Sequence, residues 1–183
     1  MGWIIGSWKI LNEGEIHQAV KKCVNVLVEN NFKLIADLAV EKKEVEYGRE
    51  LYEVLRDFEK HHGVNDLLEL LTNGLNIECV NNDYVGINIE ILLRTPSDSE
   101  QRRQLFKDTI SCWVEQNPLT FSERFFRLPK ITEDIADRYL DNPLEQTLKK
   151  TFGFHFRYKL IIKCEDESPK FKKLREKLYK ALV

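Results

Sequence analysis

The sequence predicts a single α+β domain over residues 1–183, with a mainly antiparallel sheet of about four strands covered by about eight helices. Three observations predict this class. Helical periodicity dominates residues 12–74 and 97–152, a β-hairpin pattern fills residues 75–94, and a basic strand with a C-terminal helix follows over residues 154–183. Strands and helices do not alternate in the strand-helix-strand rhythm that builds a parallel sheet.

The N-terminal part is expected to contain one strand followed by helices. Residues 3–11 are rich in Trp and Ile and lack a helical polar face, which favours a strand. Asn12 and Glu15 resemble a capping box, and the apolar positions after them keep a helical period as far as Val28. Three further helices are expected, over residues 34–39, 45–61 and 66–72.

The middle of the chain carries the strongest β signal. Residues 75–80 and 84–94 are rich in β-branched side chains and flank an Asn-Asn-Asp turn, which predicts a hairpin. Every other residue of the second strand is apolar, so one of its sides is expected to be buried. The other side includes Glu90, for which Arg157 and Lys159 are the expected cross-strand partners.

The C-terminal part is expected to hold helices and one long strand. Helices are predicted from Pro96 to Gln116 and at three capping-like starts between residues 118 and 152. Residues 154–164 alternate apolar and basic side chains, which is typical of a half-buried strand. A final helix begins at Pro169, and its inward stripe is expected to be Phe171, Leu174, Leu178 and Leu182.

Composition excludes several classes of protein. No apolar run approaches the roughly 20 residues that a membrane helix needs, and the first residues lack the features of a secretion or myristoylation signal. The four Cys residues are far apart, which argues against a zinc knuckle or a disulfide framework and favours reduced thiols in the cytoplasm. The chain also lacks a phosphate-binding loop, a nucleophile elbow and paired metal ligands. We therefore expect a non-catalytic cytoplasmic protein with no cofactor, no metal and no membrane partner.

Charge is distributed unevenly along the chain. Residues 149–183 contain 11 Lys and Arg against four Asp and Glu, a balance of +7. Since the formal net charge of the whole chain is −2, the residues before them carry −9. This asymmetry favours an acidic partner, a nucleic acid, or docking of the two halves of the chain on each other. The basic residues expected to contact a partner are His155, Arg157, Lys159, Lys172, Lys173 and Lys177.

Three functions are compatible with this pattern. The first is a protein-interaction module of the immunity, antitoxin, accessory or regulatory type, which binds an acidic macromolecular partner by charge complementarity. The second is non-specific binding of RNA or DNA by the basic C-terminal surface, although the aromatic side chains of its strand lie on the opposite face.

The third function depends on a short motif in the predicted helix over residues 45–61. The segment Arg56-Asp57-Phe58-Glu59-Lys60-His61 resembles the Arg-polar-x-x-x-His motif of HEPN-family ribonucleases. This resemblance implies that His61 acts as general base or acid, that Arg56 holds the scissile phosphate and that Asp57 orients them, without a metal. HEPN domains are helical bundles, whereas strands are predicted after this motif.

Overall fold

The computed structural model describes residues 3–6, 13–45, 51–95, 99–115, 122 and 157–182. The strands are β1 (Trp3–Gly6), β2 (Lys33–Asp37), β3 (Lys42–Glu44), β4 (Leu75–Asn81), β5 (Tyr84–Arg94) and β6 (Arg157–Cys164). The helices are α1 (Glu13–Glu29), α2 (Leu51–His62), α3 (Val64–Asn73), α4 (Glu100–Glu115) and α8 (Pro169–Leu182).

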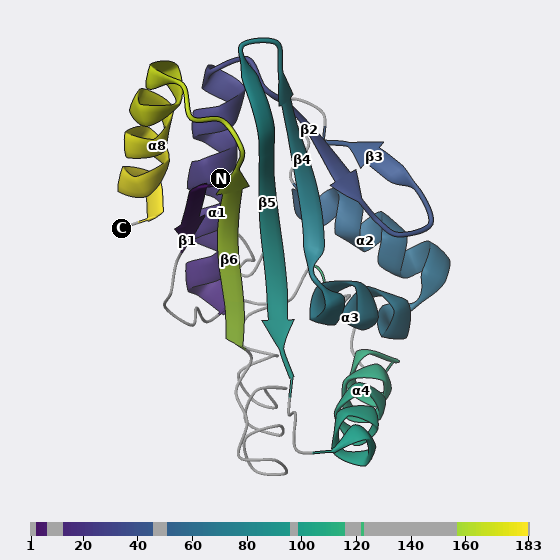
Figure 1. Ribbon diagram of the computed structural model, residues 1–183. Coiled ribbons are helices and arrows are strands. Elements are labelled where there is room, and N and C mark those ends of the chain that lie inside the picture. Colours follow the sequence, from purple (N-terminus) through teal and green to yellow (C-terminus); the bar gives the residue numbers. More distant parts are fainter. Residues whose placement is uncertain are drawn as a thin grey trace, which may run out of the picture.

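The six strands form one antiparallel sheet in the order β1-β6-β5-β4-β2-β3 (Figure 1). Helices α1 and α2 lie behind the sheet in this view, and α8 lies beside α1 at the left. The α+β class and the antiparallel sheet are confirmed. The expected numbers of elements are wrong, because the described residues contain six strands and five helices. The three short helices expected between residues 118 and 152 lie outside the described residues.

The predicted hairpin is confirmed as β4 and β5, which meet at the Asn-Asn-Asp turn. Alternate side chains of β5 are almost completely buried, namely Ile87, Ile89, Ile91 and Leu93. Strand β6 pairs with the other side of β5, and its own alternate side chains are also buried, namely Tyr158, Leu160, Ile162 and Cys164. All these residues face the same side of the sheet, so a period of two in the sequence defines the core face.

The helix expected over residues 34–39 is wrong, because this segment forms β2 and the turn into β3. Leu34 and Ala36 are buried at 2% and 0% exposure, while Lys33 points to the opposite side. Strand β2 pairs with β4, from a distant part of the chain. An apolar run this short fits both the helical period of 3.6 residues and the strand period of two. The pairing with β4 determines that it forms a strand.

Several boundaries also differ from the predicted ones. Val45 is not part of the helix expected from it, because its N–H donates to the Leu34 carbonyl at 2.7 Å, and the described residues of this helix are Leu51–His62. The N-terminal strand covers residues 3–6 of the expected 3–11, and β6 begins at Arg157. The remaining parts of those two predicted strands lie outside the described residues.

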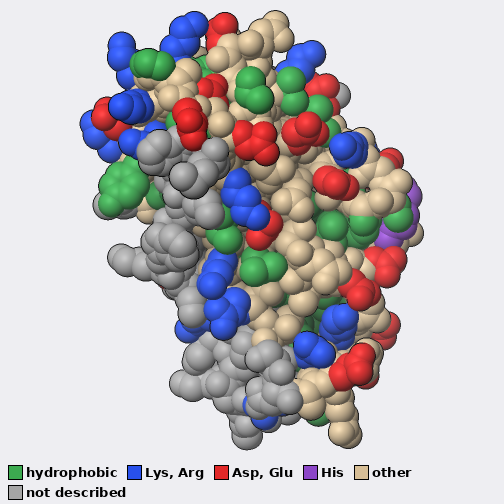
Figure 2. Space-filling view, viewed as in Figure 1, with side chains coloured by type: hydrophobic (Ala, Val, Ile, Leu, Met, Phe, Trp, Pro, Cys, Tyr) green, Lys and Arg blue, Asp and Glu red, His purple; other side chains and the backbone are tan. Residues whose placement is uncertain are grey.

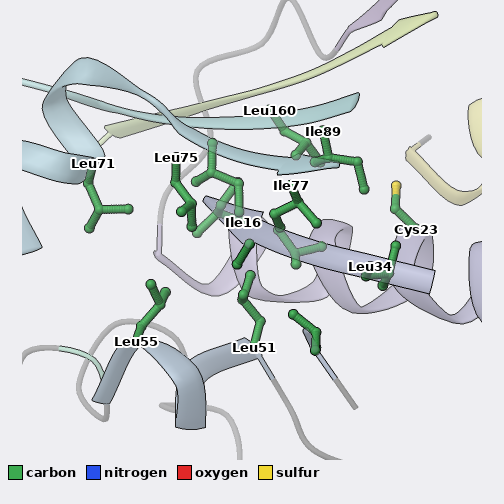
Figure 3. Close-up of a cluster of buried hydrophobic side chains, with 14 of the residues drawn as sticks. Ile16, Cys23, Leu34, Leu51, Leu55, Leu71, Leu75, Ile77, Ile89 and Leu160 are labelled. Atoms are coloured by element: carbon green, nitrogen blue, oxygen red, sulfur yellow. The ribbon is translucent and has the colours of Figure 1, made fainter. Parts of the chain in front are cut away.

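One continuous hydrophobic core joins the helices to the inner face of the sheet (Figure 3). Figure 3 shows Ile16 of α1, Leu55 of α2 and Leu71 of α3 on the same side of the sheet as Ile77 and Ile89. All five side chains are 0–1% exposed. The core therefore fixes α1, α2 and α3 on one face of the sheet and leaves the charged strand positions on the other.

The start of α8 is held by its own capping residues and by β5. The Asp166 carboxylate accepts hydrogen bonds from the N–H groups of Ser168 at 2.7 Å and Val85 at 3.3 Å. The N–H of Phe171 donates to the Ser168 carbonyl at 3.0 Å, and Pro169 occupies the first helical position, where its missing N–H costs nothing. Hydrogen bonds with Ser168 lower the pKa of Asp166, so this contact is kept at neutral pH and weakens in acid.

Candidate functional site

The predicted partner-binding residues lie on two different faces of the molecule. Lys172, Lys173 and Lys177 are exposed on α8, which packs in the helical layer against α1. Arg157 and Lys159 are half-buried on the outer face of β6. The structure therefore places the three lysines on one exposed helix and separates them from the two strand residues. His155 lies outside the described residues.

On the outer face of the sheet, Glu90 neutralises a neighbouring lysine. Glu90 is opposite Ile161, and its Oε2 atom lies 3.4 Å from the Nζ atom of Lys163. The expected partners are therefore wrong in detail, since Arg157 is opposite Arg94 and Lys159 is opposite Leu92. Strand β5 does pair with β6, but the basic partner of Glu90 is Lys163, which was not predicted.

The amphipathic pattern of α8 determines which of its side chains reach solvent. Phe171, Leu174 and Leu178 are buried at 1%, 2% and 0% exposure, as the predicted inward stripe requires. Because these residues recur every three or four positions, the remaining sides of the helix must carry the lysines. Figure 2 shows blue Lys and Arg side chains gathered over α8 at the upper left.

An open groove of about 450 Å³ lies between α1 and α8. It is lined by Lys22, Asn25, Val26, Glu29, Lys177, Lys180 and Ala181, so three lysines face one carboxylate. Tyr179, also on α8, is 61% exposed and does not line the groove. We call the α8 lysines Lys172, Lys173, Lys177 and Lys180, together with Lys22 and Tyr179, the basic surface.

Three members of the basic surface were not predicted as partner-binding residues, namely Lys22, Tyr179 and Lys180. Lys22 is distant from α8 in sequence and joins the surface only because α1 packs against α8. The helical period of α8 did signal Tyr179 and Lys180, since both fall outside its inward stripe.

The lysines of the basic surface outnumber the carboxylates beside them, which are Glu29 in the groove and the exposed Glu176 on α8. No ion pair between described residues involves Lys22 or the α8 lysines of this surface. Lys163, by contrast, is paired with Glu90 on the sheet. The basic surface therefore presents an excess of positive charge to solvent, which attracts an acidic partner over distances of about 10 Å.

The ribonuclease-like motif lies on α2. Nδ1 of His61 lies 2.7 Å from the Asp57 carbonyl oxygen. Since a carbonyl oxygen has no proton to donate, Nδ1 is the donor of this hydrogen bond. In the neutral ring, the lone pair is therefore on Nε2, which is the state that a general base requires. Arg56 Nη2 lies 3.8 Å from Asp57 Oδ1, and these side chains are 28% and 32% exposed.

The helix separates Arg56 from His61. Five residues correspond to a rotation of about 140° beyond a full turn, so these two side chains leave α2 from different sides. Asp57 and His61 are four residues apart and share one side. Asp57 therefore contacts both residues, Arg56 through its carboxylate and His61 through its carbonyl, while the side chains of Arg56 and His61 leave α2 from different sides.

Glu59, inside the same motif, has a structural role. Glu59 is only 6% exposed. Its Oε1 atom accepts hydrogen bonds from the N–H of Ser122 at 2.9 Å and from the Ser122 hydroxyl at 3.0 Å. A buried carboxylate needs such donors to offset its lost hydration. The contact therefore attaches residue 122 to α2.

Three of the four cysteines are buried free thiols. Burial raises the pKa of Cys23 and Cys79 to about 12 and that of Cys164 to about 11, so these thiols are protonated at neutral pH. Cys79 and Cys164 are both opposite Ile87, on the two strands beside β5. Two strand spacings, about 10 Å, exceed the reach of a disulfide.

Neither a membrane-spanning helix nor a metal-binding cluster occurs among the described residues. None of their helices combines the length and apolar composition that crossing a bilayer requires. Nor do three or more of their His, Cys, Asp and Glu side chains gather in an arrangement that could hold a metal ion. Comparisons with protein-family models, curated proteins and solved structures found no match.

Proposed function

We propose that the protein is a non-catalytic interaction module that binds the acidic surface of a partner protein through its basic surface. The observation that carries this proposal is the exposure of the α8 lysines beside a groove in which three lysines face one carboxylate. Charge complementarity of this kind accelerates association and selects the partner. The exposed ring of Tyr179 supplies the aromatic anchor that usually contributes most to affinity.

Within this class, the proposed role is that of an immunity, antitoxin, accessory or regulatory protein, which acts by covering the surface of another protein. The proposed location is the cytoplasm, because Cys23, Cys79 and Cys164 are free thiols in the core, as a reducing compartment favours. Neither the role nor the location requires a reactive pocket on this chain.

The test is a charge reversal of α8. We expect the combined variant Lys172→Glu, Lys173→Glu and Lys177→Glu to bind its partner about tenfold more weakly or worse, because attraction becomes repulsion at three points. The tagged chain is used to capture its partner from extracts of the source cell at low salt, and the affinity of the purified pair is then measured. All three side chains are exposed, so the thermal melting curve should change little.

A matched control carries Lys33→Glu, Lys60→Glu and Arg103→Glu, which change the net charge equally at exposed positions outside α8. Partner binding by this control should stay within about twofold of the unmodified chain at moderate salt. Equal loss in both variants, or unchanged binding by the α8 variant, would contradict the proposal. Co-purified RNA or DNA whose binding falls steeply with salt would favour the nucleic-acid alternative.

A metal-independent ribonuclease is the second candidate function, and the hydrogen bond that His61 Nδ1 donates favours it. Because Nδ1 donates to the Asp57 carbonyl, exposed His61 can accept a proton on Nε2 from a ribose hydroxyl. This candidate predicts cleavage of single-stranded RNA in the presence of a chelator, and a loss of about 100-fold or more in His61→Ala. His62→Ala serves as the control on the same helix. Intact RNA after incubation with the purified chain, alone and with its captured partner, would reject this candidate.

A further inference from the structure

A second groove, of about 520 Å³, lies between the β2–β3 turn, α2 and α3. Phe58 and Leu70 contribute buried apolar side chains to its lining, at 6% and 8% exposure. Val40 lines it from the turn and is 67% exposed. An aliphatic side chain this exposed, next to an apolar lining, is typical of a surface that a partner covers.

The turn that presents Val40 adopts a costly backbone conformation. Ala39 has φ of 68°, in the left-handed region that residues with a Cβ atom rarely enter. The Asp37 carboxylate accepts a hydrogen bond from the Ala39 N–H at 3.0 Å, and the Val40 N–H donates to the Leu38 carbonyl at 2.8 Å. These bonds hold the turn, so the position of Val40 is fixed before a partner arrives.

Carboxylates surround this apolar surface. Asp37, Asp66 and Glu69 line the groove, and none of its lining residues is basic. The Nζ atom of Lys107 lies 3.8 Å from Glu69 and offsets part of that charge, so the groove keeps an excess of about two negative charges at neutral pH. On α3, Asp66, Glu69, Leu70 and Asn73 recur every three or four residues and form one side of the helix.

We propose that this groove binds a cationic segment of a partner protein, in which an aliphatic or aromatic side chain is flanked by Lys or Arg. The apolar side chain covers Val40 and Leu70, while its basic neighbours contact Asp37, Asp66 and Glu69. Charge complementarity determines this occupant, because an acidic segment would be repelled by three carboxylates and a neutral one would leave them unpaired.

The groove and the basic surface lie at opposite ends of the sheet. Figure 1 shows α8 beside α1 at the left and α3 near the lower end of β4 at the right. In Figure 2, acidic side chains appear along the right-hand edge, on the side where α3 lies. A chain with both surfaces can hold two partners of opposite charge at once, which goes beyond the single acidic partner proposed above.

The experiment uses the full chain with labelled Val and Leu methyl groups, titrated with a synthetic peptide of one Phe flanked by two arginines on each side. We expect the methyl signals of Val40 and Leu70 to shift with a dissociation constant in the micromolar range. The double variant Asp66→Asn and Glu69→Gln should weaken binding about tenfold, because it removes two of the three carboxylates. Val40→Asn should also weaken it several-fold without affecting folding, since Val40 is exposed.

The matched control, Asp83→Asn with Glu115→Gln, neutralises the same two residue types at exposed positions outside the groove, and should bind as the unmodified chain does. Methyl signals of the groove that ignore the peptide, or that respond equally to a peptide with Glu in place of Arg, would overturn the proposal. Groove signals that instead shift with the concentration of the chain alone would show that a second copy fills the site, which also overturns it.

Discussion

Replacing Phe171 with alanine is expected to lower the free energy of unfolding by about 3–5 kcal/mol, the range for a buried phenylalanine. Phe171 is 1% exposed and is one of the largest fully buried side chains of the core. Its removal leaves a cavity where α8 packs in the helical layer, so the loss should appear as a lower midpoint in urea denaturation. The expected effect is large because α8 is part of the same core as the sheet.

Tyr179→Ala is the matched control on the same helix. Its ring is 61% exposed, so its removal should change the free energy of unfolding by less than about 0.5 kcal/mol. A destabilisation of similar size in both variants would mean that α8 is not anchored by Phe171. A negligible effect of Phe171→Ala would mean that α8 is dispensable for folding, and the basic surface would lose its fixed geometry.

Gly86→Ala is expected to destabilise the protein by about 2–4 kcal/mol, which combines backbone strain with a steric clash. Gly86 has φ of 65°, and an added Cβ atom would lie 2.9 Å from the Cβ atom of Glu165. The Gly86 carbonyl accepts a hydrogen bond from the Glu165 N–H at 3.2 Å, so this close approach joins β5 to the segment before α8. Thermal and urea denaturation measure the change.

Gly63→Ala separates strain from clash. Gly63 has φ of 90°, but an added Cβ atom there would meet nothing within 4 Å. We therefore expect a loss of only about 1–2 kcal/mol from the backbone conformation. Equal losses of unfolding free energy in Gly86→Ala and Gly63→Ala would show that the clash with Glu165 does not contribute to the destabilisation.

Local sequence patterns were sufficient for the elements that carry their own signals. The hairpin of β4 and β5 has a turn of Asn and Asp between two alternating strands, and both the turn and the strands are confirmed. The final helix has Pro169 at its start and an apolar stripe at helical spacing, which the buried Phe171, Leu174 and Leu178 confirm. In both cases the local preference agrees with the tertiary structure.

The sequence was insufficient where distant segments determine the outcome. Strand β2 is short, and its apolar residues acquire a strand conformation by pairing with β4, about 40 residues later. Strand β1 likewise pairs with β6 from the other end of the chain. Register is a property of both partners, so the contact of Glu90 with Lys163 could not be distinguished from the expected ones before the alignment of β5 and β6 was known.

For the candidate sites too, local patterns were sufficient within one element and insufficient where distant segments meet. The exposed lysines of α8 were predicted, because the period of a single helix separates its charged sides from its apolar stripe. Lys22 joins them only through the contact of α1 with α8, and the second groove combines residues of β2, α2 and α3 with those of a strained turn. Surfaces built from several elements have no signature in any one stretch of sequence.

The most direct test of the account is lysine footprinting of the full chain, free and bound to its captured partner, by acetylation and mass spectrometry. We expect Lys172, Lys173 and Lys177 to react several-fold more slowly in the complex, while Lys33 and Lys60, which are also exposed, react at unchanged rates. Unaltered reactivity of the three α8 lysines in a complex that protects lysines elsewhere would contradict it.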